Sequence, residues 1–382
     1  KDGALAVELI GLSVRDFRNL SGQVFSFGKA TNSIIGANGA GKTSLLEAMV
    51  VLGNLRSFRT TTLRRAVRHN ETNFRLVGTV STADRTHSLE QVVEIGAPVT
   101  RTLRVDGAKV NVEKYLQLFP VFAITAQDRE LITGGPEGRR SMLDRFVFLL
   151  RPAHLDQLRS YRRLLRQRNA ALVAQSSDAE IEAWEAPLSS AAAAVIEARE
   201  RGTEILSERF SEEWRELSRG DQPDIALEYR SEAWSGPFDG AKKVEDLYRQ
   251  RYNETRTRDR QQGFTGDGPH RHDLGLKTAG RSVRYVLSSG QTKGVAAALR
   301  LATLAQVEKE RNERFPVIVD DVDAELDGGA LTLLVERLGD KRQLFLSSTS
   351  ERVAELAGPG AVSYTHLRAH ETTCCISYAV FC

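Results

Sequence analysis

The sequence predicts an α/β fold with a mixed sheet and an inserted α-helical lobe. Short runs of alternating apolar and polar residues, bounded by turn residues, predict strands in the first third of the chain. From Arg139 to about Arg219, apolar residues recur three and four apart among Arg, Glu, Ala and Leu, which predicts helices. A glycine-rich loop joins an apolar strand to a helix with one apolar face, an arrangement typical of nucleotide-binding α/β domains.

Composition is that of a water-soluble globular chain. Of 382 residues, 41% are hydrophobic and 27% are charged. The longest apolar stretches are far shorter than the roughly 20 residues that a membrane span needs. No apolar run follows a basic start, so we expect no secretory signal and a cytoplasmic location. The net charge of +3 is too small to indicate nucleic-acid binding by itself.

The expected elements follow the hydrophobic periodicity and the turn residues along the chain. We expect strands at 7–14, 24–27 and 33–35, a helix at 44–52, strands at 74–80, 89–95 and 102–105, helices within 139–219, a helix starting at 288–290, a strand at 316–319, a helix at 331–338 and a strand at 343–346. A polar stretch rich in Arg and Gly occupies 251–280. The expected divisions are a first half of an ATPase lobe (1–138), a helical arm (139–222), a second half (223–362) and a tail (363–382).

The glycine-rich loop matches the pattern G-x-x-x-x-G-K-[ST]. It reads Gly36-Ala37-Asn38-Gly39-Ala40-Gly41-Lys42-Thr43, with Ser44 next. Glycines let backbone N–H groups surround phosphates, Lys42 reaches the β- and γ-phosphates, and the Thr43 hydroxyl ligates Mg²⁺. The alternative is a tight turn followed by a chance Lys-Thr pair, which the strand–loop–helix context disfavours. We therefore predict ATP and Mg²⁺ as ligands of this loop.

An apolar strand followed by two acids, Val317-Ile318-Val319-Asp320-Asp321, supplies the complementary motif. Asp320 is expected to hold the metal through its water shell. Asp321 is expected to act as the general base toward the attacking water, so we count Asp321 and Lys42 as the catalytic candidates. Many strands end in an acidic turn, and that remains the alternative for this pair taken alone.

A third motif, Leu287-Ser288-Ser289-Gly290-Gln291, resembles the Leu-Ser-Gly-Gly-Gln signature of the ABC-type ATPases. A serine and a glycine at a helix N-terminus offer a hydroxyl and N–H groups to an anion, although an ordinary helix cap has the same composition. The resemblance implies an ABC-type P-loop ATPase head in which the signature of one subunit reaches the γ-phosphate held by the other. Ser288, Gly290 and Gln291 would then bind nucleotide across an ATP-dependent homodimer.

The long helical insertion between loop and signature is similar to the SMC-like branch of these ATPases. Several runs resemble the RecF family over the chain from Leu9 to about Leu356. The runs are Asp16-Phe17-Arg18-Asn19-Leu20, Arg56-Ser57-Phe58-Arg59-Thr60, Gly138-Arg139-Arg140-Ser141-Met142-Leu143-Asp144, Thr265-Gly266-Asp267-Gly268-Pro269-His270-Arg271-His272-Asp273-Leu274 and Asp320-Asp321-Val322-Asp323-Ala324-Glu325-Leu326-Asp327. The chain departs from the family pattern at Ala126-Gln127-Asp128, where Pro-Glu-Asp is usual, and at Ala324, where serine is usual.

The resemblance implies roles for further residues. Arg18 and Asn19 would hold the nucleotide beside the loop, and Gln127 or Asp128 would lie in the Q-loop region that senses Mg²⁺ and γ-phosphate. Asp327 would belong to the dimer seam, and Ser348 or Thr349 would occupy the switch position. For Phe17 there are two alternatives, namely stacking on the nucleotide and burial in the core.

The resemblance also implies a function in recombinational repair and replication-fork maintenance. ATP would drive dimerisation on double-stranded DNA near junctions with single-stranded DNA, slow hydrolysis would open the dimer, and RecR with RecO would be partners in loading the recombinase. The activity implied is a weak, DNA-stimulated hydrolysis of ATP. A basic cluster with Phe58 and His69 interleaved is the candidate DNA surface, a solvated helix face being the alternative. Its members are Arg56, Arg59, Arg64, Arg65 and Arg68.

The alternative functions are the ATPase half of an overcoming-lysogenization-defect-like nuclease and an ABC transporter subunit. The long helical insertion and the Asp320-Asp321 pair disfavour the transporter subunit. A third alternative is a DNA-binding protein that uses ATP with negligible turnover. The final segment from about Ser363 loses the preceding periodicity and resembles translated sequencing-adapter read-through, so we exclude it from fold reasoning. It holds all three cysteines, and the alternative for His366, His370, Cys374 and Cys375 is a metal knuckle.

Overall fold

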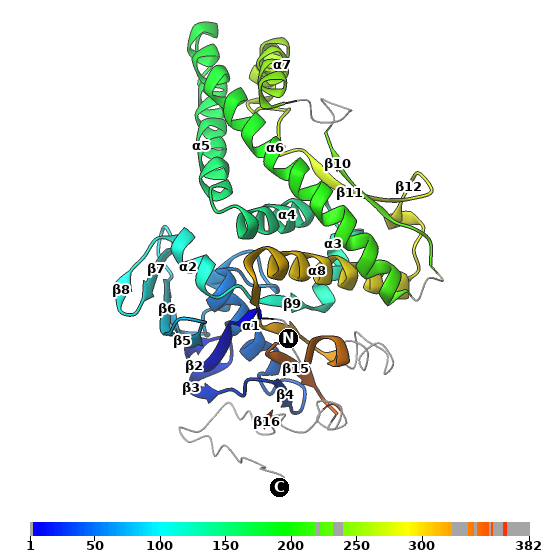
Figure 1. Cartoon of the computed structure of the whole chain (residues 1–382). Helices are drawn as coiled ribbons and strands as arrows, with labels where there is room; N and C mark the ends of the chain where they lie inside the picture. The colour runs from blue at the N-terminus through cyan, green and yellow to red at the C-terminus, as the bar shows by residue number, and fades with distance from the viewer. Residues whose placement is uncertain are drawn as a thin grey trace. The chain divides into compact units, whose positions relative to one another are not determined.

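The computed structural model describes residues 3–218, 222–231, 240–322, 335–339, 342–350, 353 and 362–364. The chain divides into two compact units (Figure 1). Unit 1 combines Lys1–Asp128 with Glu308–Cys382, and unit 2 is Arg129–Val307. Helix α8 (Ser289–Arg311) crosses the division near its C-terminal end. Among the described residues, no helix combines the length and the apolar content of a membrane span.

Unit 1 contains a parallel sheet with the strand order β16-β4-β15-β14-β9. Its strands are β4 (Thr31–Ile35), β9 (Phe122–Ile124), β14 (Val317–Val319), β15 (Leu344–Ser348) and β16 (Val362–Tyr364). β4, β14 and β15 are buried along their whole length, as expected for a sheet covered on both faces. Because these strands run parallel, the segments that follow β4, β14 and β15 begin at one edge of the sheet.

A second sheet in unit 1 is antiparallel, with the order β3-β2-β5-β6-β7-β8. Its strands are β2 (Glu8–Phe17), β3 (Leu20–Ser26), β5 (Asn73–Ser81), β6 (Thr86–Glu94), β7 (Thr100–Val105) and β8 (Ala108–Lys109). Buried and exposed residues alternate along β5 and β6, so one face is solvated. A short parallel pair joins β1 (Leu5–Ala6) to β13 (Glu313–Arg314), and α2 is Val112–Leu118.

Helix α1 (Lys42–Asn54) contacts both large sheets, packing on β2, β5 and β6 of the antiparallel sheet and on β15 of the parallel one. Nearly every residue of this helix is buried, so it has no solvated face. The single mixed sheet that we expected is therefore divided into a parallel and an antiparallel sheet on α1. The predicted α/β class with an inserted helical lobe is confirmed.

Unit 2 is mainly helical. Its helices are α3 (Glu130–Thr133), α4 (Pro136–Leu150), α5 (His154–Val173), α6 (Asp178–Leu217), α7 (Ala241–Gln262) and most of α8, and its strands are β10 (Ala226–Arg230), β11 (Asp273–Thr278) and β12 (Arg281–Ser282). A capping box between Ser177 and Glu180 starts the long helix α6. Apolar residues of α5, α6 and α7 form one core cluster.

The structure differs from the expectations in three places. Residues 251–262, read as part of a polar stretch, are the second half of α7, whose buried face includes the polar side chains of Thr255 and Asp259. The units divide after 128 and 307, whereas we expected divisions after 138 and 222. Strand β16 reaches Tyr364, inside the segment that we had set aside as a tail. Asp323–Asp327, the first part of the expected helix at 331–338 and all the cysteines lie outside the described residues.

Candidate functional site

The glycine-rich loop follows β4 and ends in the first turn of α1. Gly39 and Gly41 have φ angles of 82° and 103°, a region that residues with a side chain rarely adopt. Within the loop the Ala40 amide donates to the Ala37 carbonyl, and the Leu45 amide donates to the Gly41 carbonyl at 2.8 Å. The glycines thus allow the chain to turn tightly into the N-terminus of a helix, where N–H groups favour an anion.

Lys42 is held over this loop. Its Nζ donates to the Gly36 carbonyl oxygen at 2.6 Å and to the Ala37 carbonyl oxygen at 3.0 Å, and the residue is only 9% exposed. An ammonium group has three donor hydrogens and no acceptor. The loop carbonyls therefore fix the position of a positive charge at the mouth of the anion-binding turn.

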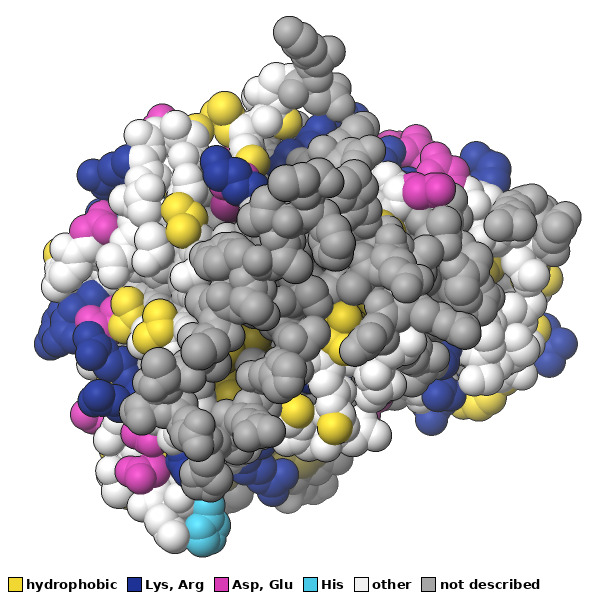
Figure 2. Space-filling view, turned by 90° about the horizontal axis from the view of Figure 1, so that it is seen from below, with side chains coloured by type: hydrophobic (Ala, Val, Ile, Leu, Met, Phe, Trp, Pro, Cys, Tyr) yellow, Lys and Arg dark blue, Asp and Glu magenta, His cyan; other side chains and the backbone are white. Residues whose placement is uncertain are grey.

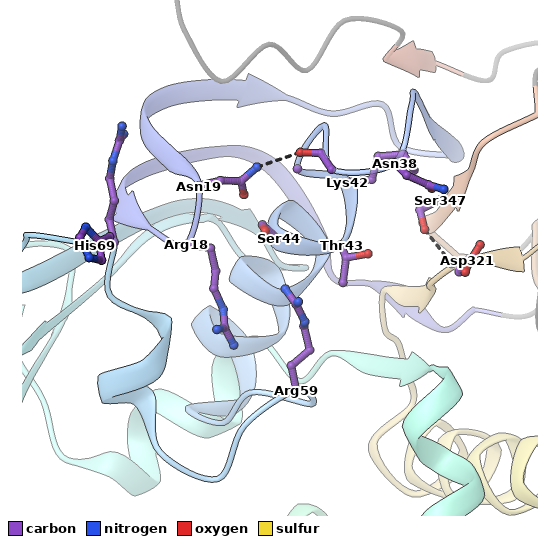
Figure 3. A pocket seen from close by; sticks show the side chains of 13 residues that line it. Arg18, Asn19, Asn38, Lys42, Thr43, Ser44, Arg59, His69, Asp321 and Ser347 are labelled. Atoms are coloured by element: carbon purple, nitrogen blue, oxygen red, sulfur yellow. Dashed lines mark hydrogen bonds between the residues drawn. The ribbon is translucent and has the colours of Figure 1, made fainter.

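Asp320 and Asp321 follow β14 at the same sheet edge. One Asp320 carboxylate oxygen, Oδ1, accepts from the Thr43 hydroxyl at 3.1 Å and from the Ser347 hydroxyl at 2.7 Å. The Asp321 amide donates to Ser347 Oγ at 2.8 Å, and Asp321 has a left-handed φ of 53° (Figure 3). Ser347, at the end of β15, thereby positions both acids. From the sequence we expected Ser348 or Thr349 at the switch position, and Ser347 was not predicted.

Asp320 is buried, and burial raises its pKa, an effect that the hydrogen bonds from Ser347 and Thr43 oppose. Its carboxylate and the Thr43 hydroxyl are hard oxygen donors on adjacent elements. Mg²⁺ is held in many nucleotide sites by one or two protein oxygens together with phosphates and water. The donor set of Thr43 and Asp320 fits that ion. Among the described residues no cluster of three His, Cys, Asp or Glu offers an all-protein metal site.

A buried glutamate fixes two arginines beside the loop. Glu47 of α1 is fully buried and accepts from Arg18 Nη2 at 2.7 Å and Nε at 2.9 Å. It also accepts from the Ser57 hydroxyl at 2.5 Å and lies 3.4 Å from Arg59 Nη1. Asn19 Nδ2 donates to the Gly39 carbonyl at 3.3 Å, and Asn19 Oδ1 is buried with no hydrogen-bond partner among the described residues. In the sequence, the run Arg56 to Thr60 was singled out by its resemblance to the family, which drew attention to Ser57 and Arg59. Nothing in the sequence indicated a role for Glu47.

These groups surround a pocket of about 630 Å³ (Figure 3). Its lining consists of Arg18, Asn19, Asn38, Gly39, Gly41, Lys42, Thr43, Ser44, Arg59, Arg68, His69, Asp321 and Ser347. Four of these residues are Arg or Lys and one is Asp, so the pocket favours a polyanion. Arg59 and Arg68, which we grouped into a DNA surface, lie on this pocket. Arg56, Arg64 and Arg65 do not line it.

The remaining predicted site residues are not brought to the pocket. Gln127 is exposed in the 3₁₀ turn Ala126–Arg129, and Asp128 is buried with its carboxylate accepting from the Thr125 amide at 2.8 Å. The Ser348 hydroxyl donates to the Ser350 carbonyl at 3.0 Å. Phe17 is fully buried against Phe74, which places it in the core.

The signature lies in unit 2 and caps α8. The Ser288 amide donates to Gln291 Oε1 at 2.8 Å, and the Gln291 amide donates to Ser288 Oγ at 3.2 Å. This reciprocal pair is a capping box. The exposed Gly290 lies between these partners at the first turn. None of the signature residues lines the nucleotide-sized pocket described above.

Comparison with known proteins gives concordant matches. Residues 8–372 match the family model described as the RecF/RecN/SMC N terminal domain. The chain is 33% identical over 365 residues to the "DNA replication and repair protein RecF" of Anaeromyxobacter sp. (strain Fw109-5), covering 94% of this chain and 97% of that protein. It is 32% identical to the protein of the same name from Yersinia enterocolitica, covering 92% of this chain and 94% of that one.

Solved structures agree. The structure of the recombination mediator protein RecF-ATPrS in the RecFOR pathway is similar with a TM-score of 0.84 and 26% identity, covering 94% of this chain and 96% of that one. The SmcHead bound to the C-winged helix domain of ScpA has a TM-score of 0.51 and 16% identity over 93% of both chains, which shows a shared fold alone.

Proposed function

This chain belongs to the RecF family, and on that premise we propose that it is an ATP-binding, ATP-hydrolysing DNA-repair protein whose dimer closes on double-stranded DNA. The observation that carries the proposal is the pocket that Lys42, Thr43 and Asp321 line from two motifs far apart in sequence, with Asp320 hydrogen-bonded to Thr43. A similar solved protein is described as RecF-ATP, which supports ATP as the ligand.

The residues of the pocket divide the work of binding ATP and activating water. The loop amides and Lys42 bind phosphate oxygens, and Arg18, Arg59 and Arg68 add positive charge around them. Thr43 and Asp320 would hold Mg²⁺, which supplies charge neutralisation on the β- and γ-phosphates. Asp321, exposed to the pocket, accepts a proton from the attacking water. A P–O bond to that water forms, the bond between the β–γ bridging oxygen and the γ-phosphorus breaks, and ADP leaves with the electron pair.

The signature would complete this site in a second copy of the chain. Ser288 and Gly290 lie at the start of an α-helix, where a hydroxyl and N–H groups favour an anion, so a γ-phosphate held by a partner would give them a ligand. ATP then has greater affinity for the closed dimer, which is what a nucleotide-driven switch requires. By family, we propose that this dimer acts near junctions of double- and single-stranded DNA and helps to load the recombinase with RecR and RecO.

The test is the mass in solution by light scattering with ATP, Mg²⁺ and gapped duplex DNA. We expect the wild type to become a DNA-bound dimer and Ser288→Arg to stay monomeric, because the arginine side chain fills the anion site. Ser177→Arg is the matched control, since it removes the serine of another capping box in the same unit. We expect it to dimerise as the wild type does. A wild type that stays monomeric and ignores DNA would overturn the proposal.

For the DNA surface we propose the solvated face of the antiparallel sheet. Arg15 pairs directly with Arg75 across β2 and β5, and Arg104 pairs directly with Lys109 across β7 and β8. Like charges in such positions repel each other. Glu90 of β6 lies between these pairs and completes a staggered row of charged side chains. It is opposite Arg104 in register, and its carboxylate is 2.7 Å from Arg75 Nε and 3.2 Å from Arg104 Nη1.

Excess positive charge on this face points to an anionic partner. Among the described residues no carboxylate pairs with Arg15 or Lys109, and both are exposed. Figure 2 shows Lys and Arg side chains gathered along its left edge, the side on which Figure 1 places β6, β7 and β8. The row crosses five strands, or roughly 19 Å at the usual strand spacing. That length exceeds the width of a B-DNA major groove, about 12 Å, so the row can reach phosphates on both sides of it.

Removing two of these charges should change the salt dependence of DNA binding. For Arg15→Gln with Lys109→Gln, we expect the slope of log K against log salt concentration to become shallower by about 1.8, since each phosphate contact contributes about 0.9. The matched control is Arg162→Gln with Arg166→Gln, two exposed arginines on α5. An equal change in both double variants would show that net charge alone, rather than this face, determines the affinity.

A further inference from the structure

Two sequence runs that resemble the family, Gly138–Asp144 and Thr265–Leu274, have no place in the pocket described above. The structure brings them together at the start of β11. Arg139, in the first turn of α4, forms a bidentate ion pair with Asp273, the first residue of β11. The two nitrogen–oxygen distances are both 2.8 Å, and the arginine is 9% exposed.

The Arg139 guanidinium makes further hydrogen bonds. Its Nη1 donates to the Leu131 carbonyl at 2.9 Å and to the Gly134 carbonyl at 3.1 Å, both at the end of α3. All three guanidinium nitrogens are therefore engaged, and the side chain joins α3, α4 and β11. A planar fork of this kind fixes direction as well as distance.

Neighbouring contacts hold the residue before Asp273 as well. Arg140 Nη1 donates to the His272 carbonyl at 2.7 Å. The His272 ring lies between the hydroxyls of Tyr229 at 2.8 Å and Tyr248 at 2.6 Å. Burial, with the positive charge of Arg199 nearby, lowers the pKa of His272 to about 3, so the ring is neutral and donates one hydrogen bond while accepting the other.

Strand β11 leads into the signature. It continues through β12 and the 3₁₀ turn η3 (Val283–Tyr285), where the Leu287 amide donates to the Val283 carbonyl, and the signature follows at once. Helix α3 packs against η3. In sequence, α3 directly follows the turn with Gln127 and Asp128. The same short helix thus contacts the segment before the signature and, through Arg139, the strand that leads to it.

From this geometry we propose that Arg139 is a positioning residue that sets the orientation of the signature through Asp273. The inference rests on the proposed function, in which the signature binds the nucleotide of a second copy. Loss of the Arg139–Asp273 pair frees the start of β11 and leaves the ATP pocket unchanged. ATP binding by a single chain and ATP-driven dimerisation should therefore respond differently.

The experiment compares Arg139→Gln with Arg256→Gln in the full chain. Arg256 makes a similar bidentate pair with Glu185, at 3.1 and 2.6 Å, between α7 and α6, neither of which belongs to the β11–η3 segment that leads to the signature. Hydrogen exchange of residues 283–292 is measured without nucleotide, and light scattering measures dimerisation with ATP and Mg²⁺. For Arg139→Gln we expect at least tenfold faster exchange and at least tenfold weaker dimerisation, with ATP affinity within twofold of the wild type. Arg256→Gln should leave all three unchanged.

Asp273→Asn provides the second variant, because it keeps the shape of the side chain and removes the charge; we expect the same pattern from it if Arg139→Gln does not fold. Exchange at 283–292 that matches the wild type in the Arg139 and Asp273 variants, or that rises equally in the Arg256 variant, overturns the inference. If hydrogen exchange rises as expected in the Arg139 variant but the wild type does not dimerise with ATP, the positioning role of Arg139 is supported and the proposed dimer is rejected.

Discussion

ATP hydrolysis by the Asp321→Asn variant is expected to be at least about a hundredfold slower than that of the wild type, because a positioned general base contributes about 10² to 10⁴ in rate. Asparagine keeps the shape of the side chain and the amide hydrogen bond to Ser347, but it cannot take a proton from water. ATP binding should change by less than about twofold. Phosphate release at saturating ATP measures the first effect and equilibrium titration measures the second.

The same variant separates a cycling switch from a protein that merely holds ATP. If hydrolysis opens the dimer, Asp321→Asn should remain on DNA with ATP for at least ten times longer than the wild type. Asp84→Asn, which removes an exposed carboxylate in the β5–β6 turn, is the control. Unchanged phosphate release would remove Asp321 from the role of general base. Reduced release with unchanged retention on DNA would indicate that hydrolysis does not control opening.

Lys42→Met is expected to weaken ATP binding about a hundredfold or more. Methionine fills similar space but removes the ammonium group that the carbonyls of Gly36 and Ala37 hold over the loop. Phosphate oxygens then lose a charge-assisted hydrogen bond in a largely buried position. Titration with a fluorescent ATP analogue measures the affinity, and light scattering with ATP should show a monomer.

Lys29→Met is the control for that variant, because Lys29 is an exposed lysine of the same unit whose side chain is 83% exposed. Its affinity for ATP should equal that of the wild type. A Lys42→Met protein that binds ATP normally would contradict our assignment of the phosphate site. It would transfer the main electrostatic contribution to Arg18, Arg59 and Arg68, which line the same pocket.

Much of the fold could be predicted from the sequence, because hydrophobic periodicity and turn residues are local signals. The strands of the antiparallel sheet alternate, and the arm repeats apolar residues at helical spacing, so the periodicity predicts both. The second half of helix α7 was not predicted as a helix, because its buried face includes the polar residues Thr255 and Asp259, which hydrogen-bond to each other at 3.2 Å. A polar residue satisfied in the core looks like a solvated one in the sequence. The split into two sheets was equally hidden, since strand pairing is a non-local property.

For the candidate site, the sequence by itself determined the glycine-rich loop, because its glycines, lysine and threonine act within one contiguous turn. It also located the two acids after an apolar strand and the signature at a helix start. Only the tertiary structure brought Thr43 to Asp320, which are 277 positions apart, and added Ser347 and Glu47. Tertiary structure also placed Arg59 and Arg68, which we had grouped as a candidate DNA surface, on the lining of the pocket, and joined Arg139 to Asp273. The physical reason is that each of these side chains acts through hydrogen bonds to residues far away in the sequence. Only folding of the chain brings those partners within hydrogen-bond distance.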